Sequence, residues 1–334
     1  MTPPSRPATG VRLHIVTGKG GTGKTTVAGA LALALASGGK KVLLCEVEGR
    51  QGIASLFDVA PLPYGERRIA VGSDGGEVYA LAIDPEDALM EYLDMFYRLG
   101  RAGKALDRFG VIDFATTVAP GMRDVLLIGK VYEATHRTET SRRTKGRPTY
   151  DAVVLDAPPT GRIGRFLNVN TEVAGIAKVG PIRNQAVSIM RLLQSPATLV
   201  HLVASLEEMP VQEALDGVYE LDRIGLPVGA IIVNQLRESE LMSDQLEAAG
   251  AGRLDEGEIE SALKEAGISA DDNVLAGLLD EARQHAERVT LERHQRARVE
   301  GSDHRVLELP YLNDGIDLGA LYELAETICS SDVI

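Results

Sequence analysis

Cysteine is scarce in this sequence, which has 334 residues and only two cysteines, Cys45 and Cys329. Two thiols cannot build a disulfide framework or a paired-cysteine metal site within one chain, so we expect neither zinc nor an iron–sulfur cluster. Long apolar runs are missing too: none approaches the ~20 residues that cross a bilayer, and MTPPSRPATG at the N-terminus has no apolar stretch of the signal-peptide kind. We therefore expect a cytoplasmic protein without stable insertion into a membrane.

Positive charge is in deficit. The sequence has 35 lysines and arginines against 48 aspartates and glutamates, which gives a net charge of −13. Such a surface repels nucleic acid as a whole, so we expect no nucleic-acid partner. Hydrophobic residues make up 44% and charged residues 25%, the usual balance of a globular chain with a sizeable core.

Apolar segments of strand length recur along the chain, separated by stretches with helical spacing. They lie at residues 11–17, 41–47, 78–83, 150–156, 197–205, 228–235 and 304–310. Strands that alternate with helices predict an α/β fold with a mostly parallel, doubly wound sheet covered on both faces. We expect a disordered leader at 1–10 and one domain over 11–334, with helical insertions at about 84–148, 162–196 and 236–303.

The segment GKGGTGKTT follows the first predicted strand and precedes an Ala/Leu-rich helix. Gly18, four residues, Gly23, Lys24 and Thr25 match the phosphate-loop pattern GxxxxGK[ST]. Glycines let the backbone turn its N–H groups toward an anion, and the start of the helix adds its positive end. Lys24 is expected at the β and γ phosphates and the Thr25 hydroxyl on Mg²⁺. The predicted nucleotide-binding residues are Gly18, Gly20, Gly21, Thr22, Gly23, Lys24, Thr25 and Thr26.

A second lysine, Lys19, directly follows the first glycine of this loop. GKGGTGKTT resembles the deviant phosphate loop shared by ArsA, the tail-anchored-protein targeting ATPases, MinD, ParA and the nitrogenase iron protein. In that group the early lysine reaches the partner's phosphates, so the resemblance implies a catalytic role for Lys19 beside Lys24 and a dimer closed by ATP. The plainer alternative is a lysine that serves solubility.

An acidic residue at the end of another predicted strand, with the segment after it, indicates which of these families the chain resembles most. YDAVVLD presents Asp156 where hydrolysis needs a carboxylate near magnesium. It continues as DAPPTGRIGRFL (156–167), which is similar to the DTAPTGHTLRFL switch of ArsA and the targeting ATPases, with departures at Arg162 and Gly164. The resemblance implies that Pro159, Thr160 and Gly161 belong to a switch that senses the γ phosphate.

Further segments are similar to the ArsA group: APGMRDVLLIGKV (119–131), SLEEMPVQEA (205–214), VNQL (233–236) and LPYLND (309–314). This resemblance implies that Asn234 recognises adenine and that Pro310 and Tyr311 lie in the loop on the adenine side. The chain is identified as a bacterial member of the ArsA and tail-anchor targeting family, and the resemblance implies an ATPase that uses ATP and Mg²⁺.

One segment departs from the family. Where its members place an aspartate in a DPAH-like segment, this sequence has CEVEGRQG (45–52). Glu48 is the best candidate to orient the attacking water, and Glu46, like Asp156, to reach magnesium through water. Gly49 and Arg50 complete this switch segment. Because proline and histidine are missing, we expect slow hydrolysis unless Gly49 repositions the loop.

Two main functions remain open, and a third receives less weight. The first is an ATP-driven switch, a homodimer or heterodimer that holds and releases an unknown protein client. The second is a nucleotide-binding scaffold with weak hydrolysis that forms half of a heterodimer with a paralogous ATPase. A kinase or biotin-pathway ligase would need a substrate pocket that the sequence does not reveal.

Overall fold

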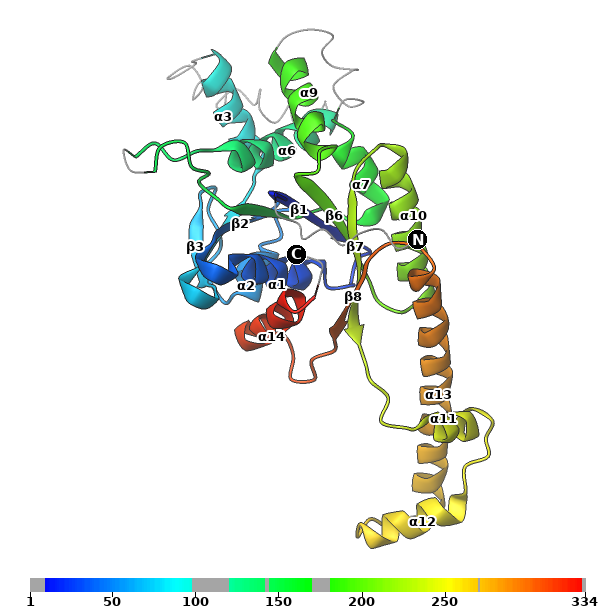
Figure 1. Cartoon of the computed structure of the whole chain (residues 1–334). Helices are drawn as coiled ribbons and strands as arrows, with labels where there is room; N and C mark the ends of the chain where they lie inside the picture. Colours follow the sequence, from blue (N-terminus) through cyan, green and yellow to red (C-terminus); the bar gives the residue numbers. More distant parts are fainter. Residues whose placement is uncertain (1–9, 98–119, 142–143, 170–180, 270, 332–334) are drawn as a thin grey trace.

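The computed structural model describes residues 10–97, 120–141, 144–169, 181–269 and 271–331 (Figure 1). The predicted leader falls almost wholly outside the described residues. Within them, eight strands form one sheet in the order β3-β4-β2-β5-β1-β6-β7-β8. All neighbouring strands are parallel except β3 and β4. The bounds are β1 (Leu13–Gly18), β2 (Lys41–Glu46), β3 (Arg67–Val71), β4 (Glu77–Ala82), β5 (Ala152–Asp156), β6 (Thr198–Ala204), β7 (Val228–Leu236) and β8 (Val306–Pro310).

The seven predicted strands are confirmed, each within two residues at both ends. Strand β3 was missed. Its sequence RRIAV begins with two charged residues, and only Ala70 is buried, because the strand lies at the edge of the sheet. Edge strands carry such charges without disturbing a core, so the apolar signal that revealed the other strands is weak here.

Helices cover both faces of the sheet, as the sequence predicted. One face carries α1 (Lys24–Ala36), α2 (Gly52–Leu56) and α14 (Leu318–Cys329). The other carries α3 (Pro85–Tyr97), α6 (Pro120–His136), α7 (Thr160–Leu167), α9 (Pro181–Leu193) and α10 (Glu208–Arg223). Two short 3-10 turns occur in connections: η1 (Ser37–Gly39) lies between α1 and β2, and η2 (Ser73–Gly75) lies between β3 and β4. Helix α1 is buried along almost its whole length between the sheet and α14 (Figure 1), which explains its Ala/Leu-rich sequence.

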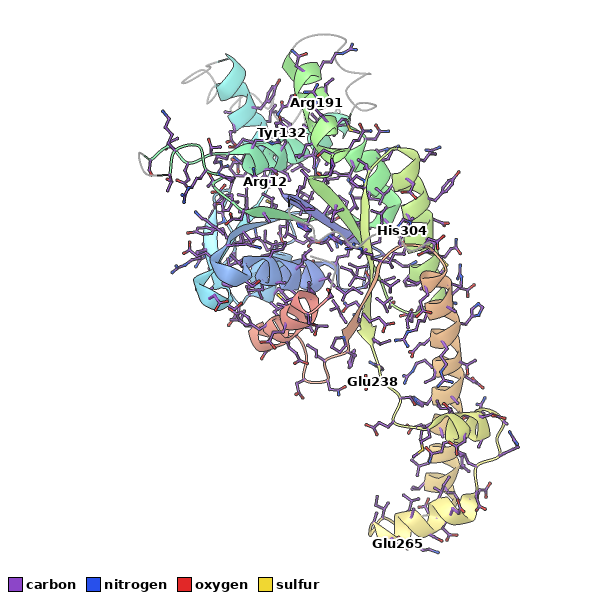
Figure 2. The ribbon with its side chains drawn as sticks, viewed as in Figure 1. Arg12, Tyr132, Arg191, Glu238, Glu265 and His304 are labelled. Carbon is purple, nitrogen blue, oxygen red and sulfur yellow. The ribbon has the colours of Figure 1, made fainter. Side chains whose placement is uncertain are left out.

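The ranges predicted as insertions contain helices joined by turns and loops where the structure describes them, and that they are insertions into one domain stays a prediction. The first contains α3 and α6, the second contains α9, and the third contains α11 (Ser243–Gly250), α12 (Glu256–Glu265) and α13 (Asp272–Glu300). We call the last three helices the arm, because they extend away from the sheet (Figure 1). Figure 2 shows Glu265 at the far end of the arm, while Glu238 and His304 mark where it leaves and rejoins the core.

The arm has a small apolar cluster of its own between α11 and α13. Helix α13 packs against α10, and Arg298 near its C-terminus is hydrogen-bonded to Gln212 of α10. That residues 11–334 form a single domain stays a prediction. Among the described helices, none is both long enough and apolar enough to span a membrane.

Parallel strands bring their carboxyl ends to one edge of the sheet, and this positions the site. Val16 and Glu46 both pair with Asp156 in register, and Gly18 pairs with Val203. Ligands of open α/β sheets bind beyond these strand ends. The segments after β1, β2, β5, β6 and β7 therefore border the edge where a ligand is expected.

Candidate functional site

A glycine-rich turn, the glycine loop (residues 18–26), joins β1 to α1. A Cβ at Gly18 would lie 2.2 Å from the backbone carbonyl oxygen of Val203, so the close approach of β6 requires glycine there. Gly21 and Gly23 have φ angles of 92° and 82°, a region that side chains disfavour. Among the described residues, no side chain caps the N-terminus of α1, so its first N–H groups are available to an anion. Gly20 is exposed on the loop.

Asn234, in β7, lies against this loop. Its side chain is 5% exposed, and its Nδ2 donates a hydrogen bond to the Thr22 carbonyl oxygen at 2.9 Å. The Thr22 hydroxyl in turn donates to the Lys19 carbonyl oxygen at 2.9 Å. A Cβ at Gly23 would lie 2.4 Å from the same Nδ2. Asn234 therefore holds the glycine loop in shape, and its predicted recognition of adenine stays a prediction.

A cavity of about 440 Å³, the loop cavity, opens over the glycine loop. Half of the predicted site residues meet there, although they come from three separate segments of the chain, which lie at or after the ends of β1, β2 and β5. Lys24 lines it, with its Nζ 3.5 Å from the Lys19 carbonyl oxygen. Thr26 is half-buried in the first turn of α1. The lining residues are Gly20, Gly21, Gly23, Lys24, Thr25, Glu46, Glu48, Arg50, Gly52, Asp156 and Pro159.

Thr25 and Asp156 form a direct pair in this cavity. The Thr25 hydroxyl donates to Asp156 Oδ2 at 2.6 Å. Burial raises the pKa of Asp156 to about 6, against the opposing hydrogen bond from Thr25 and the charge of Lys24, while the charges of Glu46 and Glu48 raise it further. Hydroxyl and carboxylate oxygens are the hard donors that Mg²⁺ prefers. The Thr25 hydroxyl and the Asp156 carboxylate therefore fit a magnesium ion as donors.

Glu46 has a role that the sequence did not suggest. Only 4% exposed, it accepts hydrogen bonds from the backbone N–H groups of Gln51 at 2.7 Å and Ile53 at 3.0 Å. One carboxylate oxygen thus binds the last residue before α2, and the other binds the first turn of α2. Since carboxylate oxygens have several lone pairs, these bonds are compatible with an additional water-mediated contact to a metal. The role of Glu46 at magnesium stays a prediction.

The acidic loop (residues 47–52) contributes Glu48 to the lining of the loop cavity. The Glu48 carboxylate lies 4.0 Å from the guanidinium of Arg50, and the Arg50 side chain is 77% exposed. Gly49 has φ 67° and Gln51 has φ 55°, so two left-handed residues bend the loop over the cavity. The structure thus brings Glu48 into the same cavity as Lys24 and Thr25.

The predicted switch at Pro159, Thr160 and Gly161 begins α7, directly beside the loop cavity. The Thr17 hydroxyl donates to the Pro158 carbonyl oxygen at 2.7 Å, which ties this segment to β1. Thr160 is 4% exposed and donates to Glu213 Oε2 at 3.0 Å. Gly161 is exposed. The switch is therefore anchored on both sides of its first helical turn.

Lys19 does not reach into the loop cavity of its own chain. Its Nζ donates to Glu213 Oε1 at 2.6 Å, and the two side chains are 31% and 33% exposed. Glu213, on α10, was not singled out from the sequence. SLEEMPVQEA contains three glutamates, and nothing in its spacing says which of them faces the glycine loop.

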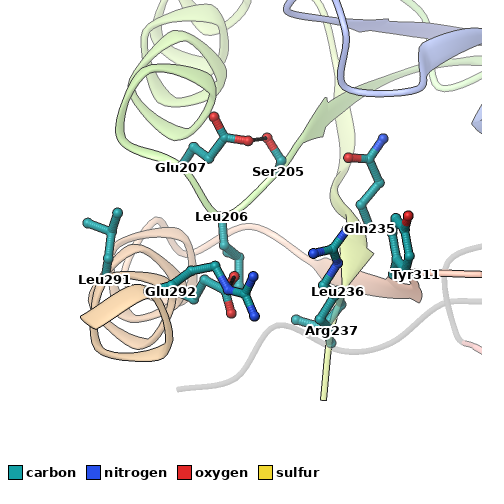
Figure 3. A pocket seen from close by; sticks show the side chains of 10 residues that line it. Ser205, Leu206, Glu207, Gln235, Leu236, Arg237, Leu291, Glu292 and Tyr311 are labelled. Atoms are coloured by element: carbon teal, nitrogen blue, oxygen red, sulfur yellow. Dashed lines mark hydrogen bonds and ion pairs between the residues drawn. The ribbon is translucent and has the colours of Figure 1, made fainter. Parts of the chain in front are cut away.

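A second cavity of about 250 Å³, the Tyr311 cavity, lies between the end of β7 and α13 (Figure 3). The guanidinium of Arg237 lies 4.0 Å from the centre of the Tyr311 ring, and Tyr311 N–H donates to the Leu236 carbonyl oxygen at 2.8 Å. Gln235 joins the two cavities, since its Nε2 would lie 3.8 Å from a Cβ at Gly23. Pro310, predicted on the adenine side, ends β8 just before Tyr311.

The described residues contain no cluster of three or more histidine, cysteine, aspartate or glutamate side chains placed to hold a metal ion. The expected absence of zinc and of an iron–sulfur cluster stays a prediction. Magnesium in this site would take most of its oxygens from the nucleotide and from water, as this ion commonly does.

Comparisons with known proteins agree with this geometry. The family described as anion-transporting ATPase matches residues 11–200. The chain is 52% identical over 330 residues to ATPase BagA of Mycobacterium tuberculosis, covering 99% of this chain and 96% of that protein. It is 29% identical to arsenical pump-driving ATPases of Escherichia coli, over 254 residues, and of Acidiphilium multivorum, over 249 residues; each match covers 70% of this chain and 41% of the relative. The glycine loop, the acidic strand ends and these matches together show that the chain is an ATPase that belongs to the anion-transporting ATPase family.

Proposed function

We propose that this ATPase is a dimeric switch that couples hydrolysis of Mg-ATP to a change in the shape of its helical insertions, through which it handles a protein client. The observation that carries the proposal is the meeting of Lys24, Thr25, Asp156 and Glu48 in the loop cavity, although they come from three strand ends. Phosphoryl transfer needs this combination of positioning and charge stabilisation.

In this proposal the glycine loop binds the β and γ phosphates through its N–H groups and Lys24. Thr25 would hold magnesium directly and Asp156 and Glu46 would hold it through water, and the bound ion would neutralise charge on the phosphates. Glu48 accepts a hydrogen bond from the attacking water and orients it. The water oxygen bonds to the γ phosphorus, the bond from that phosphorus to the bridging oxygen breaks, and a proton of the water passes by way of Glu48 to the released phosphate, which leaves ADP and inorganic phosphate.

Dimerisation is supported by the position of Lys19. It stands on the glycine loop but is directed to α10 rather than to its own loop cavity. A lysine with this placement is suited to bind phosphate oxygens outside its own chain, as the resemblance to the deviant phosphate loop implies. The partner is a second copy or a paralogous ATPase.

The nucleobase has a natural place in the Tyr311 cavity (Figure 3), because this cavity adjoins the glycine loop through Gln235. Tyr311 is 38% exposed, and its ring and the guanidinium of Arg237, 4.0 Å away, both line this cavity as planar groups on which a purine stacks. Pro310 and Asn234 lie near the ends of β8 and β7, the two neighbouring strands that lead to this cavity.

A second function, a scaffold with weak turnover that depends on a paralogous partner, is favoured by one contact. Arg50 lies 4.0 Å from the Glu48 carboxylate and competes with a water molecule for its oxygens. Phosphate release from the purified chain, measured alone and with any co-purifying paralogue, separates the two functions. Turnover by the chain alone supports the switch, whereas turnover only with the paralogue supports the scaffold.

Glu48→Gln tests the mechanism. We expect it to lower single-turnover hydrolysis by roughly 100-fold or more, since a positioned base contributes on the order of 10²–10⁴. ATP binding, measured by calorimetry, should change little because Glu48 is outside the glycine loop that binds the phosphates. Glu265→Gln, at the far end of the arm (Figure 2), is the matched control with the same loss of charge. An unchanged hydrolysis rate in Glu48→Gln removes this residue from the mechanism.

A further inference from the structure

Glu213 makes two contacts that link the glycine loop to the switch. Its Oε1 accepts from Lys19 Nζ at 2.6 Å, and its Oε2 accepts from the Thr160 hydroxyl at 3.0 Å. The hydrogen bond from Lys19 lowers the pKa of Glu213 below its usual range, so this carboxylate is ionised at neutral pH. One side chain thus binds both Lys19, which is predicted to reach a partner's phosphates, and Thr160, the first residue of α7.

The packing around this carboxylate is close. A Cβ at Gly217, one turn further along α10, would lie 2.8 Å from Leu202 and 3.5 Å from the Thr160 methyl group. A Cβ at Gly164 of α7 would lie 2.0 Å from the Glu220 carboxylate. Glycine at both positions lets α7 and α10 approach each other, so a displacement of Thr160 is felt directly by α10.

We propose that Glu213 is a positioning residue that holds Lys19 on its own protomer and ties the release of Lys19 to the movement of Thr160. This inference rests on the proposed dimeric switch, because it concerns what Lys19 must leave before it can bind a partner's phosphates. It assigns a role to a residue that takes no part in the hydrolysis described above.

Lys19 can exchange Glu213 for a partner's phosphates at little cost. Both side chains of the ion pair are about one-third exposed, so water can replace each partner while they separate. A triphosphate carries several negative charges where Glu213 carries one, and it competes for the ammonium by Coulomb attraction. When Lys19 leaves, Glu213 keeps only Thr160 as its described donor, and the carboxylate is free to turn with α7.

The first experiment examines the ion pair without any dimer. Amine-directed labelling of the nucleotide-free chain, read out at Lys19 by mass spectrometry, compares the wild type with Glu213→Gln. We expect faster labelling of Lys19 in Glu213→Gln, because its Nζ loses the carboxylate that covers it. Asp216→Asn removes a carboxylate three residues further along the same helix, where it is exposed, and should leave the labelling of Lys19 unchanged. Equal labelling of Lys19 in wild type and Glu213→Gln overturns the proposal.

The second experiment measures association with magnesium and a slowly hydrolysed ATP analogue by analytical ultracentrifugation. Glu213→Gln should lower the dissociation constant of a homodimer by roughly 2- to 25-fold, because two exposed ion pairs no longer have to be broken and each contributes roughly 1.5- to 5-fold. Asp216→Asn controls for the reduced repulsion between two acidic protomers. An unchanged or higher dissociation constant in Glu213→Gln contradicts the proposal.

A double-mutant cycle excludes a merely structural role. In a Lys19→Met background, Glu213→Gln should no longer tighten association, since there is no ammonium to release. A persistent effect in that background overturns the proposal. If the wild type fails to associate with the nucleotide at all, the dimeric switch itself fails, while the labelling experiment still reports whether Glu213 holds Lys19.

Discussion

Replacing Asn234 by alanine should weaken the binding of every ligand that carries a triphosphate, whatever its base. The Nδ2 of Asn234 donates to the Thr22 carbonyl oxygen, and both residues are at most 5% exposed. Removing the donor leaves a buried carbonyl group without its partner, which costs about 1–3 kcal/mol. The cost falls on the loop conformation in which Gly23 has φ 82°, the conformation that directs the N–H groups to an anion.

At ~1.4 kcal/mol for each factor of ten, this corresponds to a roughly 5- to 150-fold increase in the dissociation constant. Calorimetry with magnesium and ATP, GTP or inorganic tripolyphosphate measures it on three ligands that share only their phosphates. Asn184→Ala, at an exposed position of α9, is the matched control.

The pattern across the ligands decides between two roles of Asn234. Equal weakening of all three ligands supports a role in holding the glycine loop. Weakening of ATP alone, with GTP and tripolyphosphate unchanged, would refute this reasoning and show instead that Asn234 recognises adenine.

Two further predictions concern stability, measured by chemical denaturation. Burial lowers the pKa of His14 to about 3 and that of His201 to about 4, against about 6.5 in an unfolded chain. Their contribution to stability is therefore complete above pH 6.5 and is lost as the pH falls. Between pH 7 and pH 5, each histidine lowers the free energy of unfolding by about 2 kcal/mol. The double substitution His14→Leu with His201→Leu should therefore reduce the loss of stability over this pH range by about 4 kcal/mol. An unchanged pH dependence would show that these histidines take up protons in the folded state. Gly76→Ala should lower stability by at least about 1–3 kcal/mol, because its Cβ would lie 1.8 Å from the Ala36 carbonyl oxygen, whereas Gly65→Ala meets nothing within 4 Å and should be neutral.

The strands and the glycine loop could be predicted because each depends on a local pattern. An apolar run of strand length marks a buried strand wherever it occurs, and GxxxxGK[ST] fixes its own geometry once it lies between a strand and a helix. Asp156 was found for the same reason, as an acidic residue at the end of such a run. Register then places it opposite Glu46 and Val16.

The partners of the predicted residues could not be predicted, because they come from distant segments. Glu213 lies 194 positions from Lys19, and Asn234 lies 212 positions from Thr22. No spacing within either segment reveals such a contact. Glu46 shows a different difficulty: its carboxylate is occupied by the backbone N–H groups of its own following loop, which depends on the left-handed residue Gln51.

The attachment of the arm has a mechanical consequence. Helix α13 has 29 residues, and at about 1.5 Å per residue it is about 44 Å long. Arg298, near its end, donates to the side chain of Gln212, the neighbour of Glu213 on α10. A tilt of α10 by about 10° that α13 followed would therefore swing the far end of the arm by about 8 Å, as a lever amplifies a small rotation at its fulcrum.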